Sequence, residues 1–160
     1  MIDIFYTINS GEPLKLVCEQ SINPVLAVLD REYGNTSWVL AIADIQADCL
    51  MRVRSNACLW SAPPAYSGRG RPRKHGQKMR LNDPSTWLQA DAVIEIDEHP
   101  QLGPVRVRQW LDLHFYRAAE HRVNLILALK NEAHVKQSAV STLMVGLGWR
   151  TNSTLRNCLV

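Results

Sequence analysis

The fold is decided by the stretch Val25-Leu26-Ala27-Val28-Leu29, a continuous apolar run that ends at Asp30. A run of this kind is typical of a strand buried on both faces, as in a parallel or mixed sheet that helices cover. Gly34 and Asn35 then form a turn, and Asn35 or Thr36 can cap a helix. We therefore expect a buried strand over residues 25–29 that a turn connects to a helix.

A helix and a second strand complete this unit. Trp38, Ile42 and Ile45 recur at helical spacing within residues 37–45. Residues 49–54 then alternate between the two faces of a strand, which is typical of a half-buried strand. Strand, helix and strand in this order predict a compact βαβ unit over residues 25–54, and with it the α/β fold class.

The second half of the chain predicts antiparallel structure. Three β-like segments cover residues 92–96, 105–113 and 123–129, and turn-forming or polar residues separate them. Residues 61–84 before them are a long irregular stretch, and loops of that length inside a compact domain are usually functional or disordered. We expect a β-rich meander after this loop and no further element after Lys130.

The positive charge of the chain is concentrated in one segment. Between residues 49 and 82 there is no Asp or Glu, and eight of the 18 basic residues lie there. The rest of the chain holds 10 basic and 15 acidic residues, so its net charge is 10 − 15 = −5. A concentrated cationic segment on an acidic body predicts a polyanionic partner, DNA above all, because each neutralised phosphate releases a bound counterion.

Other features of the composition argue against several classes of protein. No apolar run approaches the roughly 20 residues that cross a bilayer, and the N-terminus lacks the pattern of a signal peptide. The four cysteines form no C-x-x-C pair, which argues against a zinc site and favours buried free thiols in a reducing cytosol. We expect a cytoplasmic protein with no membrane partner.

Asp30 is the candidate catalytic residue. Ligands of α/β sheets bind outside the carboxyl ends of the strands, and a carboxylate there suits a hard cation such as Mg²⁺. Two-metal phosphoryl chemistry needs two or three such carboxylates from different strands. An Asp that ends a strand before a turn is also a common turn former, and its position alone leaves both interpretations open.

Three blocks of sequence, taken in order, resemble insertion-sequence transposases of the DDE class. They are Leu29-Asp30-Arg31-Glu32-Tyr33-Gly34-Asn35, Leu50-Met51-Arg52-Val53-Arg54-Ser55-Asn56 and Tyr66-Ser67-Gly68-Arg69-Gly70-Arg71-Pro72-Arg73-Lys74-His75-Gly76. The resemblance implies an RNase H-like core with a β-rich insertion, and DNA of the bacterial nucleoid as the partner. It also implies Mg²⁺-dependent DNA cleavage and strand transfer, with Asp30 as the second metal-binding acid of a triad.

The other two acids of the triad have no match in this sequence. Asp3 lies only 27 residues before Asp30, too close to be the first acid, and Glu120 follows Tyr116-Arg117 at the wrong spacing to be the third. Glu120 is therefore expected to be a surface acid. We expect a truncated transposase that is inactive alone, and the alternative is a non-enzymatic DNA-binding module. Its expected parts are a partial core over residues 1–60, the basic loop over 61–84, the β-rich insertion over 85–130 and an irregular tail over 131–160.

The basic stretch is compatible with two modes of DNA binding. Arg69-Gly70-Arg71-Pro72 resembles the core of an AT-hook, in which two arginines lie in a narrow A·T minor groove. We favour the plainer interpretation, a flexible cationic loop that grips phosphates; the remaining alternative is a solvated charge run. The residues that we expect to contact DNA here are Arg69, Arg71, Pro72, Arg73, Lys74, Lys78 and Arg80.

Residues around the loop leave further alternatives open. Arg52 and Arg54 share one strand face beside Asp30, where they either contact the DNA backbone or face solvent. Trp60 and Tyr66 either stack on an unpaired base or pack as anchors of the loop, as aromatic residues near loop roots more often do.

The remaining charged and imidazole side chains predict no site of their own. The five histidines lack metal-ligand spacing and are expected to be ordinary surface or partly buried residues. The acidic cluster just before His99 is expected in a solvated hairpin turn; it consists of Glu95, Asp97 and Glu98.

Overall fold

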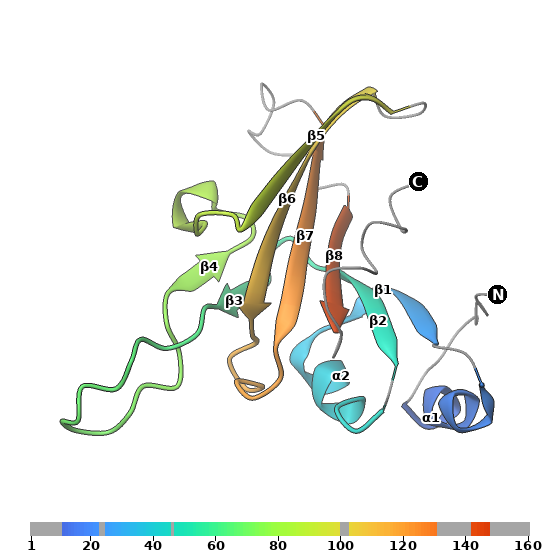
Figure 1. The fold of residues 1–160 in the computed structure, drawn as a ribbon, viewed down its shortest axis with the longest axis horizontal. Helices are drawn as coiled ribbons and strands as arrows, with labels where there is room; N and C mark the ends of the chain where they lie inside the picture. Colours follow the sequence, from blue (N-terminus) through green and yellow to red (C-terminus); the bar gives the residue numbers. More distant parts are fainter. Residues whose placement is uncertain (1–10, 23–24, 46, 100–102, 131–141, 148–160) are drawn as a thin grey trace.

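The computed structural model describes residues 11–22, 25–45, 47–99, 103–130 and 142–147 of the chain (Figure 1). Strands predominate: one six-stranded sheet has the order β1-β2-β8-β7-β6-β5, and a second sheet consists of β3 and β4. The elements are α1 (Gly11–Gln20), β1 (Leu26–Gly34), α2 (Thr36–Ala41), β2 (Asp48–Val53), β3 (Cys58–Trp60), β4 (Lys78–Arg80), the 3₁₀ helix η1 (Pro84–Thr86), β5 (Ala92–His99), β6 (Gly103–Leu113), β7 (Val123–Lys130) and β8 (Thr142–Leu147).

The predicted βαβ unit is confirmed, but its first strand is buried on one face only, since Val28 is 55% exposed. β1 and β2 pair in parallel, from Leu26 opposite Asp48 to Leu29 opposite Met51. The side chain of Asn35 caps α2 by accepting a hydrogen bond from the backbone N–H of Trp38, at 3.1 Å. The apolar spacing predicted a helix over residues 37–45, whereas α2 ends at Ala41.

The predicted antiparallel meander is also confirmed. β5 pairs with β6 and β6 with β7, both antiparallel, and the three strands cover the three β-like segments. β8 lies between β7 and β2 and pairs antiparallel with both, so it joins the meander to the βαβ unit in one sheet. The sequence had predicted no strand after Lys130; β8 contains Gly146, and glycine is depleted in strands.

Two further expectations differ from the structure. The irregular stretch ends at Gln77 rather than at residue 84, because Met79 is fully buried between the exposed Lys78 and Arg80 and this alternation forms β4. The N-terminal residues 11–20 form α1, which buries Leu14 completely. The strand expected over residues 2–6 lies outside the described residues.

One buried cluster holds both sheets together. Leu125 and Leu127 of β7 are fully buried beside Trp110 of β6, and Leu59 of β3 and Met79 of β4 belong to the same cluster. Side chains of this kind each contribute roughly 1.5–3 kcal/mol when they leave water. The small hairpin β3–β4 is therefore packed on the core that stabilises the main sheet.

None of the helices within the described ranges has the length and apolar character needed to cross a membrane.

The described cysteines are free, as expected: Cys49 is buried, and Cys18 and Cys58 are half-buried. Burial raises the pKa of the Cys49 thiol to about 12, so this thiol stays protonated at neutral pH. Cys158 lies outside the described residues.

The close approach of β1 and β2 at Gly34 gives a test of the fold. A methyl group on Gly34 would overlap the backbone carbonyl of Arg52, so Gly34→Ala has to push the two strands apart. We expect this substitution to lower the free energy of unfolding by about 1–3 kcal/mol, the usual cost of overpacking. Urea denaturation followed by circular dichroism measures the change. The exposed Ser37→Ala is the control, and equal stability of the two variants would contradict the close packing.

Candidate nucleic-acid interface

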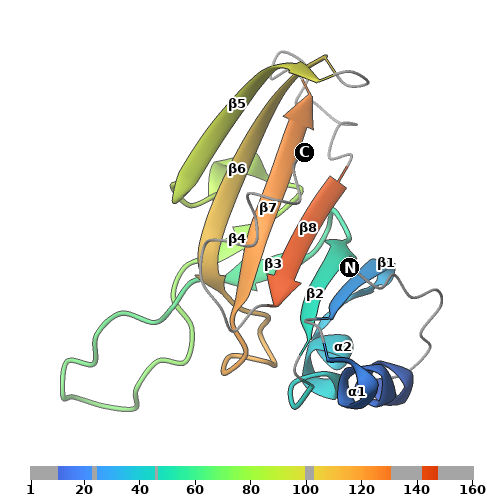
Figure 2. The same cartoon turned by 45° about the vertical axis from the view of Figure 1, so that its right-hand side comes forward.

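The predicted basic loop over residues 61–84 is irregular only over residues 61–77, and the name basic loop refers to these residues from here on. They connect β3 to β4 and project away from both sheets (Figures 1 and 2). Its two ends are joined by backbone hydrogen bonds from Ser61 N to Gln77 O and from Gly76 N to Ser61 O, each 3.0 Å long. The hydroxyl of Ser61 also accepts a hydrogen bond from Gln77 N at 2.9 Å. The loop therefore has an ordered root.

The tip of the basic loop is exposed and cationic. Gly68 and Gly70 have φ values of 80° and 76°, which bend the chain on either side of Arg69. The Tyr66 hydroxyl donates a hydrogen bond to the carbonyl of Gly70 at 2.7 Å and closes this bend. All of the loop residues expected to contact DNA are exposed; they are Arg69, Arg71, Pro72, Arg73 and Lys74. Insertion into a minor groove would require the chain to straighten at Gly70.

β4 adds two more cations beside the root of the loop. Lys78 and Arg80 are exposed, because the strand directs Met79 between them into the core. The Lys78 ammonium lies 5.3 Å from the centroid of the Trp60 ring, a cation–π contact that holds the charge near the loop. The structure thus brings Lys78 and Arg80 to the base of the same basic surface.

Aromatic and imidazole rings pack at the loop root. The His75 ring lies 4.6 Å from the ring of Tyr116 and 5.2 Å from the ring of His114, centroid to centroid. Trp60 is half-buried and lies 5.3 Å from Tyr116, centroid to centroid. Trp60 therefore packs as an anchor, whereas Tyr66 is 56% exposed and its hydroxyl forms a hydrogen bond within the loop.

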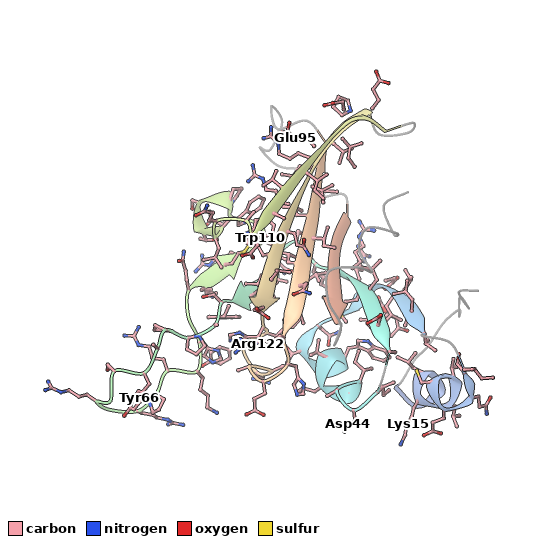
Figure 3. The ribbon with its side chains drawn as sticks, in the orientation of Figure 1. Lys15, Asp44, Tyr66, Glu95, Trp110 and Arg122 are labelled. Carbon is pink, nitrogen blue, oxygen red and sulfur yellow. The ribbon has the colours of Figure 1, made fainter. Side chains whose placement is uncertain are left out.

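His114 corrects the expectation that all histidines are surface or partly buried, because its side chain is fully buried. Its Nδ1 lies 2.7 Å from Arg122 Nη1, and its Nε2 lies 2.9 Å from His75 Nδ1. Burial, and then the charges of Arg122 and His75, lower its pKa from 6.5 to about 4. His114 is therefore neutral at physiological pH. Figure 3 shows Arg122 beside the root of the basic loop.

Asp30 lies where the regular pairing of β1 and β2 ends. The ladder is continuous up to Leu29 and shifts before Gly34, so Asp30 is the first residue beyond it. Its side chain is exposed, and its Oδ1 accepts a hydrogen bond from Glu32 N at 2.8 Å. This local hydrogen bond is the interaction that a turn-forming Asp makes.

Arg52 and Arg54 are exposed at the end of β2. Because the strands are parallel and Leu29 lies opposite Met51, Asp30 and Arg52 both follow the last regular pair of β1 and β2 and lie at the same end of that ladder. The basic loop projects from the other side of the molecule in both views (Figures 1 and 2). Asp30 and the basic loop are therefore two separate features of the surface.

The family model described as DDE superfamily endonuclease matches residues 12–112, which is well over half of the 160-residue chain. The chain belongs to the DDE superfamily endonuclease family. The matched residues include β1, Asp30 and the whole basic loop, so the family resemblance of the three sequence blocks is confirmed. Comparison with curated proteins gives no match.

Membership in the DDE endonuclease family implies a nucleic-acid substrate and, in general, metal-dependent chemistry. The described residues of this family member do not fit a Mg²⁺ site, since no three of their histidine, cysteine or acidic side chains come together to hold an ion. Asp30 offers one carboxylate, and one of its oxygens already accepts a hydrogen bond from Glu32 N. Mg²⁺ requires near-octahedral oxygen ligation, so we derive no metal-dependent step for these residues.

Glu120 and the acidic cluster of this DDE family member lie in the connection after β6 and on strand β5, respectively. Glu120 is exposed in the connection between β6 and β7, as expected for a surface acid. The acidic cluster lies on strand β5 rather than in a hairpin turn. Its Glu95 stands opposite Arg106 of β6 and forms a salt bridge with it at 2.6 Å. Asp97 and Glu98 are exposed on the same strand.

The neutral His114 predicts a pH-dependent stability. Its pKa is about 4 in the folded chain and 6.5 at its ordinary value, so the unfolded chain binds the proton first as the pH falls. The contribution of neutral His114 to the free energy of unfolding is complete above pH 6.5 and is lost as the pH falls to about 4. We expect this loss to be about 1–2 kcal/mol, after allowance for solvent screening.

Urea denaturation at several pH values, with wild type compared with His114→Gln, measures this contribution. Both proteins share the titration of their carboxylates, so the difference between the two curves isolates the imidazole. The difference should change between pH 6.5 and 4 and stay constant above pH 7. Parallel curves over the whole range would contradict a buried neutral histidine.

Proposed function

We propose that this chain is the DNA-holding part of a DDE transposase. It would comprise part of an RNase H-like core, made of β1, α2 and β2, and a β-rich insertion made of the antiparallel strands. The observation that supports the proposal is the basic loop, an exposed cationic segment whose root is fixed on the hydrophobic core. Membership in the DDE endonuclease family supports DNA as the ligand.

The charge of the loop favours phosphate binding. Arg69, Arg71, Arg73 and Lys74 are exposed on an arm that extends away from an acidic body, so they can approach a duplex without bringing acidic side chains close to it. Binding of this kind releases counterions, weakens steeply with salt and has little sequence preference. A preference for A·T tracts would favour minor-groove insertion instead.

Asp30 is proposed as the second acid of the family triad, and Arg52 and Arg54 as backbone contacts beside it. In the intact family this acid helps to hold the metal ions for phosphodiester hydrolysis and strand transfer. The exposed position of Asp30 at the sheet edge supports this role.

A non-enzymatic DNA-binding module is the second candidate function. It is favoured by the isolation of Asp30, which the described part of the chain surrounds with no metal-binding group of side chains. One carboxylate cannot hold the two metal ions that phosphoryl transfer of this type uses. The two candidates differ in whether Asp30 has a partner acid from outside the described residues.

The DNA-binding role of the loop predicts a charge-specific effect. We expect Arg69→Ala/Arg71→Ala to lower affinity for a random-sequence duplex and to reduce the slope of log K against log salt by about 0.9 for each lost phosphate contact. Fluorescence anisotropy titrations between low and moderate salt measure both quantities. The control Lys15→Ala/Arg106→Ala removes the same number of charges elsewhere and should bind nearly as wild type. If both double variants lose affinity equally, net charge rather than the loop determines binding.

The isolation of Asp30 predicts that this polypeptide alone does not cleave DNA. Purified protein with Mg²⁺ or Mn²⁺ should nick supercoiled plasmid no faster than its Asp30→Ala variant, because the described residues group no further metal ligands with Asp30. Conversion to the open circular form, followed on agarose gels, measures the rate. Nicking by wild type that disappears in Asp30→Ala would show that the chain holds a working metal centre.

A further inference from the structure

A chain of hydrogen bonds with a fixed direction links the basic loop to the connection between β6 and β7. A guanidinium only donates, so Arg122 Nη1 must be the donor to His114 Nδ1, 2.7 Å away. A neutral imidazole has one N–H, and in His114 that proton must then be on Nε2. His114 Nε2 therefore donates to His75 Nδ1 at 2.9 Å, and the proton of a neutral His75 is on its own Nε2.

These hydrogen bonds can all form only when His114 is neutral. A second proton on His114 would place an N–H against the Arg122 guanidinium, and a proton on His75 Nδ1 would face the N–H of His114. The groups that surround His114 oppose such a proton, since it is fully buried and lies beside Arg122. Lys78, next to Trp60, adds a further positive charge to the same cluster.

The hydrogen bonds from Arg122 through His114 to His75 fix the C-terminal half of the basic loop. His75 contacts the rings of both His114 and Tyr116, and each pair is nearly parallel, with an interplanar angle of 26°. The next residue, Gly76, packs so closely that a methyl group on it would overlap the carbonyl of Ala62. Arg73 and Lys74 directly precede His75, so the direction in which they leave the root depends on its position.

We propose that His114 is a positioning residue for DNA binding, which through His75 fixes the root of the basic loop and so orders the arm that presents the arginines. This inference rests on the proposed DNA-binding function. A loop that is already ordered loses less conformational freedom when it binds, so the anchor raises affinity without adding a charge. His114 itself, being buried, does not touch DNA.

Hydrogen exchange of the full-length chain at pH 7.5 tests the anchor directly. We expect His114→Phe to speed the exchange of the Gly76 and Gln77 amides by about tenfold, the effect of one lost hydrogen bond on local opening. His114→Gln can accept from Arg122 and donate to His75, so it should retain most of the protection. His121→Phe is the matched control, because it makes the same change in the same connection and should leave the root unchanged.

A second variant keeps the test independent of the fold. His75→Phe retains a ring in contact with His114 and Tyr116 but removes the acceptor, and it lies on the loop rather than in the core. It should speed exchange at Gly76 and Gln77 as His114→Phe does. Protection equal to wild type in either variant would overturn the proposal, as would loss of protection in His114→Gln equal to that in His114→Phe.

The tautomers give a spectroscopic test. Long-range ¹H–¹⁵N correlation spectra should show His114 protonated on Nε2 and unprotonated on Nδ1, and the same state for His75. In Arg122→Ala the Nδ1 of His114 loses its hydrogen-bond donor, so the ¹⁵N chemical shift of this Nδ1 should change. A proton on Nδ1 of His114 in wild type would overturn the direction of the chain.

DNA binding separates this inference from the function on which it rests. His114→Phe should weaken binding about five- to tenfold while the salt slope stays as in wild type, because no phosphate-binding charge is removed. A reduced slope would mean that contacts rather than loop order were lost, which would overturn the positioning role. Failure of wild type to bind DNA would instead reject the proposed function, and the exchange results would still decide whether His114 anchors the loop.

Discussion

The hairpin β3–β4 is held to the main sheet by a reciprocal pair of backbone hydrogen bonds between Trp60 and His114, each 2.9 Å long. Asp112 contributes to this contact: it has a positive φ of 54° and lies at the register shift near the end of β6, where such a bulge bends a strand. A two-stranded hairpin alone is marginally stable in water. The basic loop therefore has an ordered root only because its hairpin shares the core of the larger sheet.

Much of the fold could be predicted because local patterns and tertiary structure agree. The apolar run before Asp30, the Asn35 cap and the alternation after Cys49 each specify one element, and the three segments of the meander are equally regular. β8 could not be predicted, since it is short, contains glycine and is stabilised by strands far away in sequence. Helix α1 had a usable signal, because Leu14 and Val17 lie one turn apart and both face the core cluster.

The candidate site was only partly predictable. Charge counting located the basic loop, since exposed arginines need no tertiary context to be recognised. The pairing of His75 with His114 could not be found, because 39 positions separate the two rings and no local spacing links them. The nearest signal was Arg122 in the connection after β6, but its partner is the buried His114, eight positions earlier, and no local pattern links the two. The residues that order the loop are therefore encoded far from the loop itself.

The acidic strand β5 has a consequence for how copies of this protein meet. Within the described residues β5 pairs with β6 alone, so its other edge presents backbone groups that could pair with a neighbouring molecule. Val93 and Ile94 are about half exposed there and would favour such stacking. Asp97 and Glu98 oppose it, because two such edges brought together would place carboxylates against carboxylates. Charged side chains of this kind on an edge strand are a common protection against pairing between copies.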